Sequence, residues 1–358
     1  MRYFLVDNAL VEDDGPSDKL NSSHFRHFLE EMPSITHLEL HRGWVPLMDD
    51  DVWRSIMLRP NLEFFYPSSA NYLEWDSFSR LVTDSLPGEI FPSLRCLEVA
   101  ADTKTFQFLL PRLSALQEFV METYIDFSQS ASLGPIMQSL TSCSLLETGI
   151  FVGSGPVTSA DLLNLASCCP LLSRLDVNLQ SRQLEDSLDD EQFNTFVSRL
   201  KHLTVLQLRL PVNLSFQSLA SVAIHCPQMR FMQVRARIDV AELANAPDSI
   251  RFPCMESLVV SDVFMDGEWC SSSTSRHNWS KGSNPALERI MDPRFPVLNF
   301  FAFYPTRVRP AGINRQMLSR GQLILRPSSG RPPRVDVRSD MVRALIDPVP
   351  GNPYNSRF

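Results

Sequence analysis

Cysteine is the residue type in this sequence that could most readily hold a metal or attack a substrate. The seven cysteines are scattered, and Cys168 and Cys169 are adjacent, but no Cys-x-x-Cys pair is present. A zinc site needs ligands at a recognised spacing. Cys143, Cys226 and Cys254 lie, like Cys169, where a predicted helix gives way to a predicted strand. We therefore interpret the cysteines as free thiols that serve as small buried residues at these corners.

Other possible sites also lack a complete set of chemical groups. His24 and His27 are three residues apart on a predicted helix, but no carboxylate or cysteine motif completes a metal site. The acidic runs 12–14 and 49–51 lack the ligand spacing of a calcium loop and suit loops or helix N-termini. Gly-Ser-Gly at 153–155 is not the five-residue nucleophile elbow of hydrolases. The sequence therefore predicts no catalytic residue, no metal, no cofactor and no enzyme activity.

A nine-residue pattern recurs along the chain. It consists of any residue, Pro, any residue, an apolar residue, two of any kind, an apolar residue, any residue and an apolar residue. Seven copies begin at Met32, Arg59, Phe91, Cys169, Cys226, Phe252 and Phe295. Three further segments keep the apolar spacing without the proline and centre on Phe119, Gly149 and Leu206. The middle apolar positions follow one another at 22 to 32 residues, and once at 43. Most of these steps lie in or near the period of a leucine-rich repeat.

The segments between the copies have the period of helices. Phe193, Phe196 and Val197 share one helical face after Asp189, a candidate N-cap, and Phe25 begins a similar face. The apolar-x-apolar end of each copy predicts a strand that buries one face. One strand and one helix cannot shield that face alone, whereas stacked neighbours share a continuous core. The sequence thus predicts an α/β fold, a right-handed β/α solenoid of horseshoe shape with a curved parallel sheet.

The repeat pattern resembles that of fungal leucine-rich-repeat proteins, in particular the repeat half of F-box/leucine-rich-repeat proteins. The Cys-Pro-x-apolar form at Cys169 and Cys226 is typical of that class, and the resemblance covers about residues 20–305. In that family the F-box binds a Skp-type adaptor, and the repeats hold the substrate. The resemblance therefore implies a non-catalytic protein-binding module for substrate recognition in ubiquitin ligation.

An F-box itself is not found in this sequence. The chain before Met32 is too short to hold one, and Leu-Pro-Gly-Glu-Ile at 86–90, which mimics its opening, runs directly into the copy at Phe91. This argues against binding of a Skp-type adaptor. A second hypothesis therefore stays open, namely a free-standing leucine-rich-repeat scaffold with no link to ubiquitin ligation.

Composition divides the chain into three parts. Residues 1–33 are predicted to form an N-terminal cap, and residues 34–305 the solenoid, with an insertion at 262–294. Within the insertion we interpret the Ser-rich stretch 270–282 as a loop. Residues 306–358 hold a predicted final strand and a Pro/Arg-rich tail. The net charge is -8, but residues 305–358 carry +7, so the remainder carries -15. This acidic body, together with the lack of a signal peptide or a long apolar run, predicts an intracellular protein, cytoplasmic or nuclear, that binds neither nucleic acid nor a membrane.

The strand positions between the apolar pairs are predicted to line the concave face, because side chains alternate along a strand. From N- to C-terminus these positions change from acidic near Glu98 to basic near Arg209. Phe231 is expected to be exposed beside Arg235, and aromatic and Arg side chains anchor many interfaces. We therefore predict that an acidic or phosphorylated protein partner binds this face at Gln207, Arg209, Phe231, Gln233 and Arg235.

Overall fold

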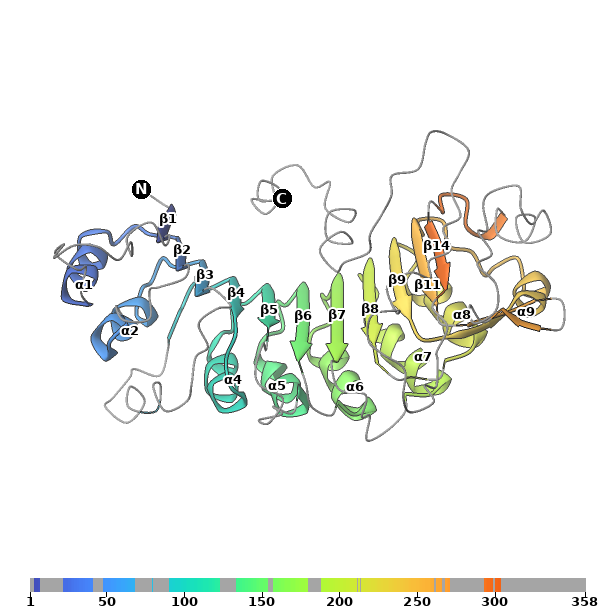
Figure 1. Cartoon of the computed structure of the whole chain (residues 1–358), viewed down its shortest axis with the longest axis horizontal. Helices are drawn as coiled ribbons and strands as arrows, with labels where there is room; N and C mark the ends of the chain where they lie inside the picture. Colours follow the sequence, from blue (N-terminus) through green and yellow to red (C-terminus); the bar gives the residue numbers. More distant parts are fainter. Residues whose placement is uncertain are drawn as a thin grey trace, which may run out of the picture.

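A curved sheet with helices along its convex side forms the body of the protein (Figure 1). The computed structural model describes residues 3–6, 22–40, 48–67, 79, 90–122, 133–153, 157–179, 188–210, 212, 214–260, 262–265, 268–270, 293–298 and 300–303. In these residues eleven strands form one sheet in the order β1-β2-β3-β4-β5-β6-β7-β8-β9-β11-β14. Every neighbouring pair is parallel. The predicted β/α solenoid with a curved parallel sheet is therefore confirmed.

The strands of this main sheet are short and follow the order of the chain. They are β1 (Tyr3–Val6), β2 (His37–Leu40), β3 (Phe64–Pro67), β4 (Cys96–Val99), β5 (Glu118–Glu122), β6 (Thr148–Gly153), β7 (Arg174–Leu179), β8 (Val205–Arg209), β9 (Phe231–Val234), β11 (Ser257–Val260) and β14 (Phe300–Phe303). Each of the ten predicted repeat segments supplies one of these strands. β1, in the predicted N-terminal cap, pairs with β2 and forms the edge of the described sheet.

The helices connect consecutive strands. They are α1 (Ser22–Glu31), α2 (Asp50–Met57), α4 (Thr103–Leu109), α5 (Leu133–Ser139), α6 (Ser159–Cys168), α7 (Asp190–Arg199), α8 (Phe216–His225) and α9 (Val240–Asn245). Short 3-10 turns, η2 (Leu110–Arg112) and η3 (Leu140–Ser142), extend α4 and α5. Asp189 caps α7 as predicted, because its side chain accepts from the backbone N–H of Gln192. The acidic run 49–51 is a helix N-terminus, since Asp49 accepts from the backbone N–H of Val52 at the start of α2.

The core side chains of the strands stand in register from one end of the sheet to the other. The middle apolar positions of the ten repeat segments pair directly across neighbouring strands, in the order Leu38, Phe65, Leu97, Phe119, Gly149, Leu175, Leu206, Met232, Leu258 and Phe301. The side chains of this row from Leu38 to Leu258 are buried. The hydrophobic core is therefore a continuous column between sheet and helices, as expected for stacked units that cannot bury their apolar faces alone.

Gly149 is the one member of this row without a side chain, and the space is filled by aromatic neighbours. The Phe119 and Phe151 rings lie edge to face at 5.7 Å between centroids. A Cβ atom on Gly149 would lie 2.9 Å from Phe151 Cε2 and 3.6 Å from Leu175 Cδ1. Glycine at this position thus makes room for the Phe151 ring.

A shared backbone acceptor fixes the register where each strand begins. The carbonyl of Arg95 accepts from the N–H groups of Gln117 and Glu118 at 2.7 and 2.8 Å, and the carbonyl of Gln117 accepts from those of Glu147 and Thr148 at 2.8 and 3.0 Å. The same two-donor arrangement recurs in the other repeats at the carbonyls of Thr36, Glu63, Glu147, Ser173, Thr204 and Arg230. This ladder ties the starts of β3 to β9 and of β11 to the repeat before each of them.

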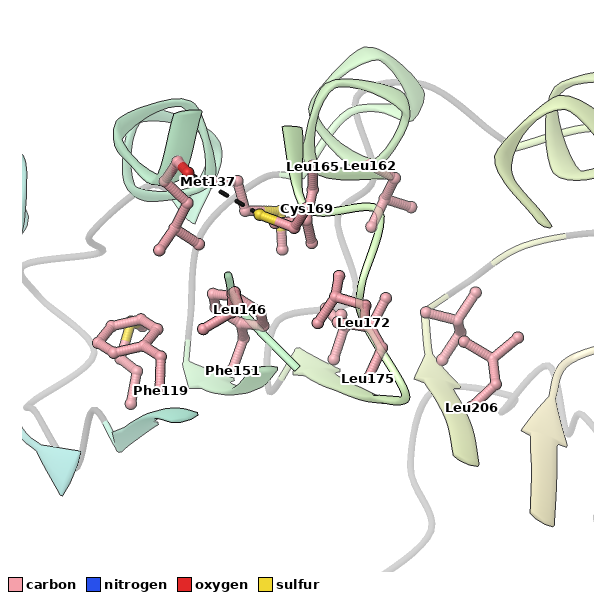
Figure 2. Close-up of a cluster of buried hydrophobic side chains, with 14 of the residues drawn as sticks. Phe119, Met137, Leu146, Phe151, Leu162, Leu165, Cys169, Leu172, Leu175 and Leu206 are labelled. Carbon is pink, nitrogen blue, oxygen red and sulfur yellow. Dashed lines mark hydrogen bonds between the residues drawn. The ribbon is translucent and has the colours of Figure 1, made fainter. Parts of the chain in front are cut away.

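Three cysteines form a second set of links, at the corners between helix and strand. Cys143, Cys169 and Cys226 are buried, and their Sγ atoms lie 3.4–3.8 Å from carbonyl oxygens at the end of the preceding repeat's helical segment. Figure 2 shows the bond from Cys169 to the Leu140 carbonyl, among the core side chains. The interpretation of these cysteines as buried corner residues is confirmed. For Cys254 this interpretation is wrong, because Cys254 lies two positions after Phe252, the corner residue of its repeat, and is exposed.

Arg59 occupies the same corner position in the repeat of β3. Its guanidinium donates to the carbonyls of Met32, at 2.8 Å, and of Leu29. These two carbonyls correspond to those of Leu200 and Val197, which accept from Cys226. Burial lowers the pKa of Arg59 from its ordinary value, but an arginine stays charged under all ordinary conditions. An arginine and a thiol thus each add a side-chain hydrogen bond to the same helix-end carbonyls, which also accept a backbone N–H.

The insertion begins with strands that the sequence analysis did not predict. β10 (Arg237–Asp239) pairs in parallel with β12 (Asp262–Met265), and β12 pairs in antiparallel with β13 (Glu268–Cys270). These strands precede the predicted Ser-rich loop at 270–282, of which the structure describes Cys270 alone, at the end of β13. β10 follows β9 and β12 follows β11, so two neighbouring repeats pair a second time. Such pairing satisfies backbone groups between distant segments and leaves no periodic signal in the sequence.

Several expectations fall outside the described residues. These are the Ser-rich stretch 271–282, most of the F-box-like segment 86–90, and the whole of the predicted final strand and tail at 306–358.

The packing around Gly149 predicts the effect of a larger side chain there. Gly149→Leu should lower the free energy of unfolding by about 1–3 kcal/mol, because it must displace the Phe151 ring in a packed core. Urea denaturation followed by circular dichroism measures this change. The control Ser144→Leu, on an exposed corner of the same repeat, should stay within about 0.5 kcal/mol. Equal stability of the two variants would contradict the packing described.

The buried corner thiols predict that the stability of the folded protein depends on pH. Burial raises the pKa of Cys143, Cys169 and Cys226 to about 12, from an ordinary value of 9.0. Between these values the unfolded chain loses thiol protons that the folded chain keeps, so stability falls as pH rises through this window. At neutral pH the three thiols should resist Ellman's reagent in the folded protein, whereas exposed Cys254 reacts. Rapid reaction of the Cys169 thiol without unfolding would contradict their burial.

Candidate binding face

The candidate site is the strand face, which we define as the outward side chains of β2 to β9 and β11 and of Arg235. Side chains alternate along a strand, so the residues between the core positions point away from the helices. One row of this face holds His37, Phe64, Cys96, Glu118, Thr148, Arg174, Val205, Phe231 and Ser257. The next row holds Glu39, Tyr66, Glu98, Val120, Ile150, Asp176, Gln207, Gln233 and Val259.

Charges of opposite sign gather at opposite ends of the strand face. Glu39 on β2, Glu98 on β4 and Glu118 on β5 supply negative charge. Arg174 on β7 and Arg209 on β8 supply positive charge, and Arg235 follows directly after β9. Because strand order equals chain order, the predicted passage from acidic to basic along the sequence becomes a passage along the surface.

Apolar side chains occupy the middle and the C-terminal part of the face. Val120 and Ile150 lie side by side on β5 and β6, and Val205 lies beside Phe231 on β8 and β9. The expectation that Phe231 is exposed is wrong, since only 6% of its surface is accessible. Its neighbours in register are Val205 and Ser257, on strands about 4.8 Å away on either side.

The other four predicted binding residues lie together. Gln207 and Gln233 pair in register on β8 and β9, and Gln207 is buried, with 3% of its surface exposed. Arg209 Nη2 donates to Gln207 Oε1 at 3.0 Å. Arg209, Gln233 and Arg235 are half-buried. The structure thus places the predicted polar residues in one cluster beside the Phe231 ring.

Arg174 and Asp176 were missed as candidate residues. Asp176 on β7 lies directly beside Gln207, and Arg174 precedes it by two positions on the same face. Both occupy the same outward positions of their repeat as Val205 and Gln207 do in the next. The repeat spacing alone could therefore have identified them.

The acidic end of the face holds polar and aromatic contacts. The His37 and Phe64 rings stack at 5.7 Å between centroids, and Thr36 Oγ1 lies 2.9 Å from His37 Nδ1. Cys96 Sγ donates to Glu118 Oε2 at 3.7 Å. These contacts hold the polar and aromatic side chains of this end against one another.

Within the described residues no three His, Cys, Asp or Glu side chains come close enough to hold a metal ion. His27 instead faces Glu31 on α1, with 3.1 Å between Nε2 and Oε1. A search of the described helices finds none with the length and apolar character needed to span a membrane. The described strand face thus offers charge, hydrogen bonds and apolar contact, which are the means of non-covalent binding.

The fold defines the class of this protein as a parallel β/α solenoid. Comparison with protein-family models and with curated proteins finds no match for this chain.

Proposed function

We propose that the protein is a non-catalytic protein-binding module whose strand face recognises substrates, as F-box/leucine-rich-repeat proteins do in ubiquitin ligation. The observation that carries this proposal is the position of the described helices. They cover one side of the main sheet, and none of them lies over the strand face (Figure 1).

The dimensions of the strand face suit a protein partner. Strands about 4.8 Å apart give the described sheet a length of roughly 50 Å, and two or three outward side chains per strand give a width of about 10 Å. The resulting area of about 500 Å² is comparable with the ~800 Å² that one partner buries in a standard interface. A small molecule would use only a fraction of such a surface.

The chemistry of the face also suits a protein partner. Val120 and Ile150 form one apolar pair, Val205 and Phe231 form another, and Arg174 and Asp176 on β7 lie between the two pairs. Protein interfaces commonly combine apolar contacts with polar and charged groups. Opposite charges at the two ends would fix the direction in which a partner binds, because electrostatic complementarity contributes more to specificity than to affinity.

The link to ubiquitin ligation is supported by the resemblance of the Cys-Pro repeats. Cys169 and Cys226 both hold carbonyls of the preceding repeat, so the cysteine of this motif has a structural task in the chain.

Charge reversal on the strand face tests the binding proposal. Arg209→Glu combined with Arg235→Glu should reduce capture of the partner by about tenfold or more, because like charges replace complementary ones. The measurement is affinity capture from cells by the full chain, quantified by mass spectrometry. The control variant, Lys104→Glu with Arg112→Glu, makes the same charge change at exposed positions on the helix side. An identical set of captured proteins for wild type and both variants would contradict binding at the basic end of the face.

Binding of a Skp-type adaptor distinguishes a role in ubiquitin ligation from a free-standing scaffold. Retention of a purified Skp-type adaptor by the full chain would support the role in ubiquitin ligation. Capture that depends on the strand face without retention of the adaptor would instead support a scaffold with no ubiquitin-ligase link.

A further inference from the structure

Two arginines on neighbouring strands of the strand face have an unused hydrogen-bond donor. The Nε atoms of Arg174 on β7 and Arg209 on β8 are buried and have no hydrogen-bond partner in the described part of the chain. Neither guanidinium forms an ion pair with a described carboxylate. Arg59 Nε also has no partner, but the rest of its guanidinium bonds the corner carbonyls. Unsatisfied buried polar atoms are rare in folded proteins, and a missing ligand is one physical reason for them.

The register brings these two arginines to either side of one residue pair. Asp176 lies beside Gln207, and Asn178 lies beside Arg209. The bond from Arg209 Nη2 to Gln207 Oε1, at 3.0 Å, turns the Arg209 guanidinium back along β8 toward Gln207. Arg174 begins two residues before Asp176, about 7 Å away along the same face. The Asp176–Gln207 pair therefore lies between Arg174 and Arg209.

We propose that Arg174 and Arg209 together bind the carboxylate of an Asp or Glu side chain in an extended segment of the partner protein. A guanidinium can donate to one carboxylate from two nitrogens at once, and such paired bonds are strong and directional. Because both Nε atoms are buried, a side chain must turn outward on binding for its Nε to take part. Gln207 acts as a positioning residue, because its buried amide holds Arg209 in place. This inference rests on the proposed function, since it assigns one contact within the same binding face.

The local charge favours an acidic group. Arg174, Arg209 and Asp176 have a net charge of +1, and Arg235, next to Arg209 after β9, raises it to +2. This charge attracts a carboxylate and a phosphate alike, so the experiment below compares the two groups.

Peptide selection on the full chain tests this inference. Short peptides are selected from a random display library, and their affinities are measured by fluorescence anisotropy. We expect an Asp or Glu to recur at one position of the selected peptides. Arg174→Met and Arg209→Met should each weaken binding by about tenfold or more, which corresponds to the loss of a charged hydrogen bond. Replacing the recurring acid by its amide should have a similar effect on wild type and little further effect on either variant.

The controls keep the inference separate from the proposed function. Arg112→Met, on the helix side, should leave the affinity unchanged, and thermal melting checks that each variant folds. The peptide's acid-to-amide change tests the contact even if a variant fails to fold. Two outcomes would overturn the carboxylate site but leave the proposed function intact. In the first, Ile150→Glu abolishes peptide binding but neither arginine variant weakens it. In the second, the peptides bind more tightly when phosphoserine replaces the acid. If no selected peptide depended on the strand face, both the carboxylate site and the proposed function would be contradicted.

Discussion

One backbone constraint underlies this structure, namely that each strand from β3 to β9, and likewise β11, begins on a carbonyl of the repeat before it. Each of these carbonyls accepts two N–H groups of the next repeat, for example those of Ser173 and Arg174 at Glu147. A slip of one residue would break these bonds and would also turn every core side chain to the outer face. The ladder and the apolar column therefore specify the same register, and such agreement between local and global preferences is typical of sequences with a single fold.

The register also determines what the strand face can present. Since strand order follows chain order, side chains that share a repeat position become neighbours across the sheet. Asp176, Gln207 and Gln233 lie in one line for this reason, and the arginines gather at one end of the face. The corner residues likewise connect neighbouring repeats on the helix side. Cys143, Cys169 and Cys226, and Arg59 in their place, give a second hydrogen bond to helix-end carbonyls that also accept a backbone N–H of their own repeat.

Periodic features could be predicted from the sequence, and non-periodic ones could not. The ten strands, the cap at Asp189 and the buried corner cysteines follow from spacing and residue type. The prediction that Phe231 is exposed was wrong, because alternation along a strand tells which face of the sheet a side chain lies on but not how closely its neighbours pack around it. β12 was missed because its pairing with β10 joins segments without a shared pattern. The repeat spacing could have placed Arg174 on the strand face, but its unused Nε atom is visible only in three dimensions.

Hydrogen exchange of the full chain, followed by mass spectrometry of its peptides, tests the shared register most directly. The amides that enter β5, β6, β7 and β8 bond the preceding repeat, so they can open only when neighbouring repeats separate. We expect strong protection of the first amides of all four strands. Their protection should also change by the same factor when the pH or the denaturant concentration changes. Exchange at the rate of an unstructured peptide at any of them, in protein that remains folded, would contradict a continuous ladder.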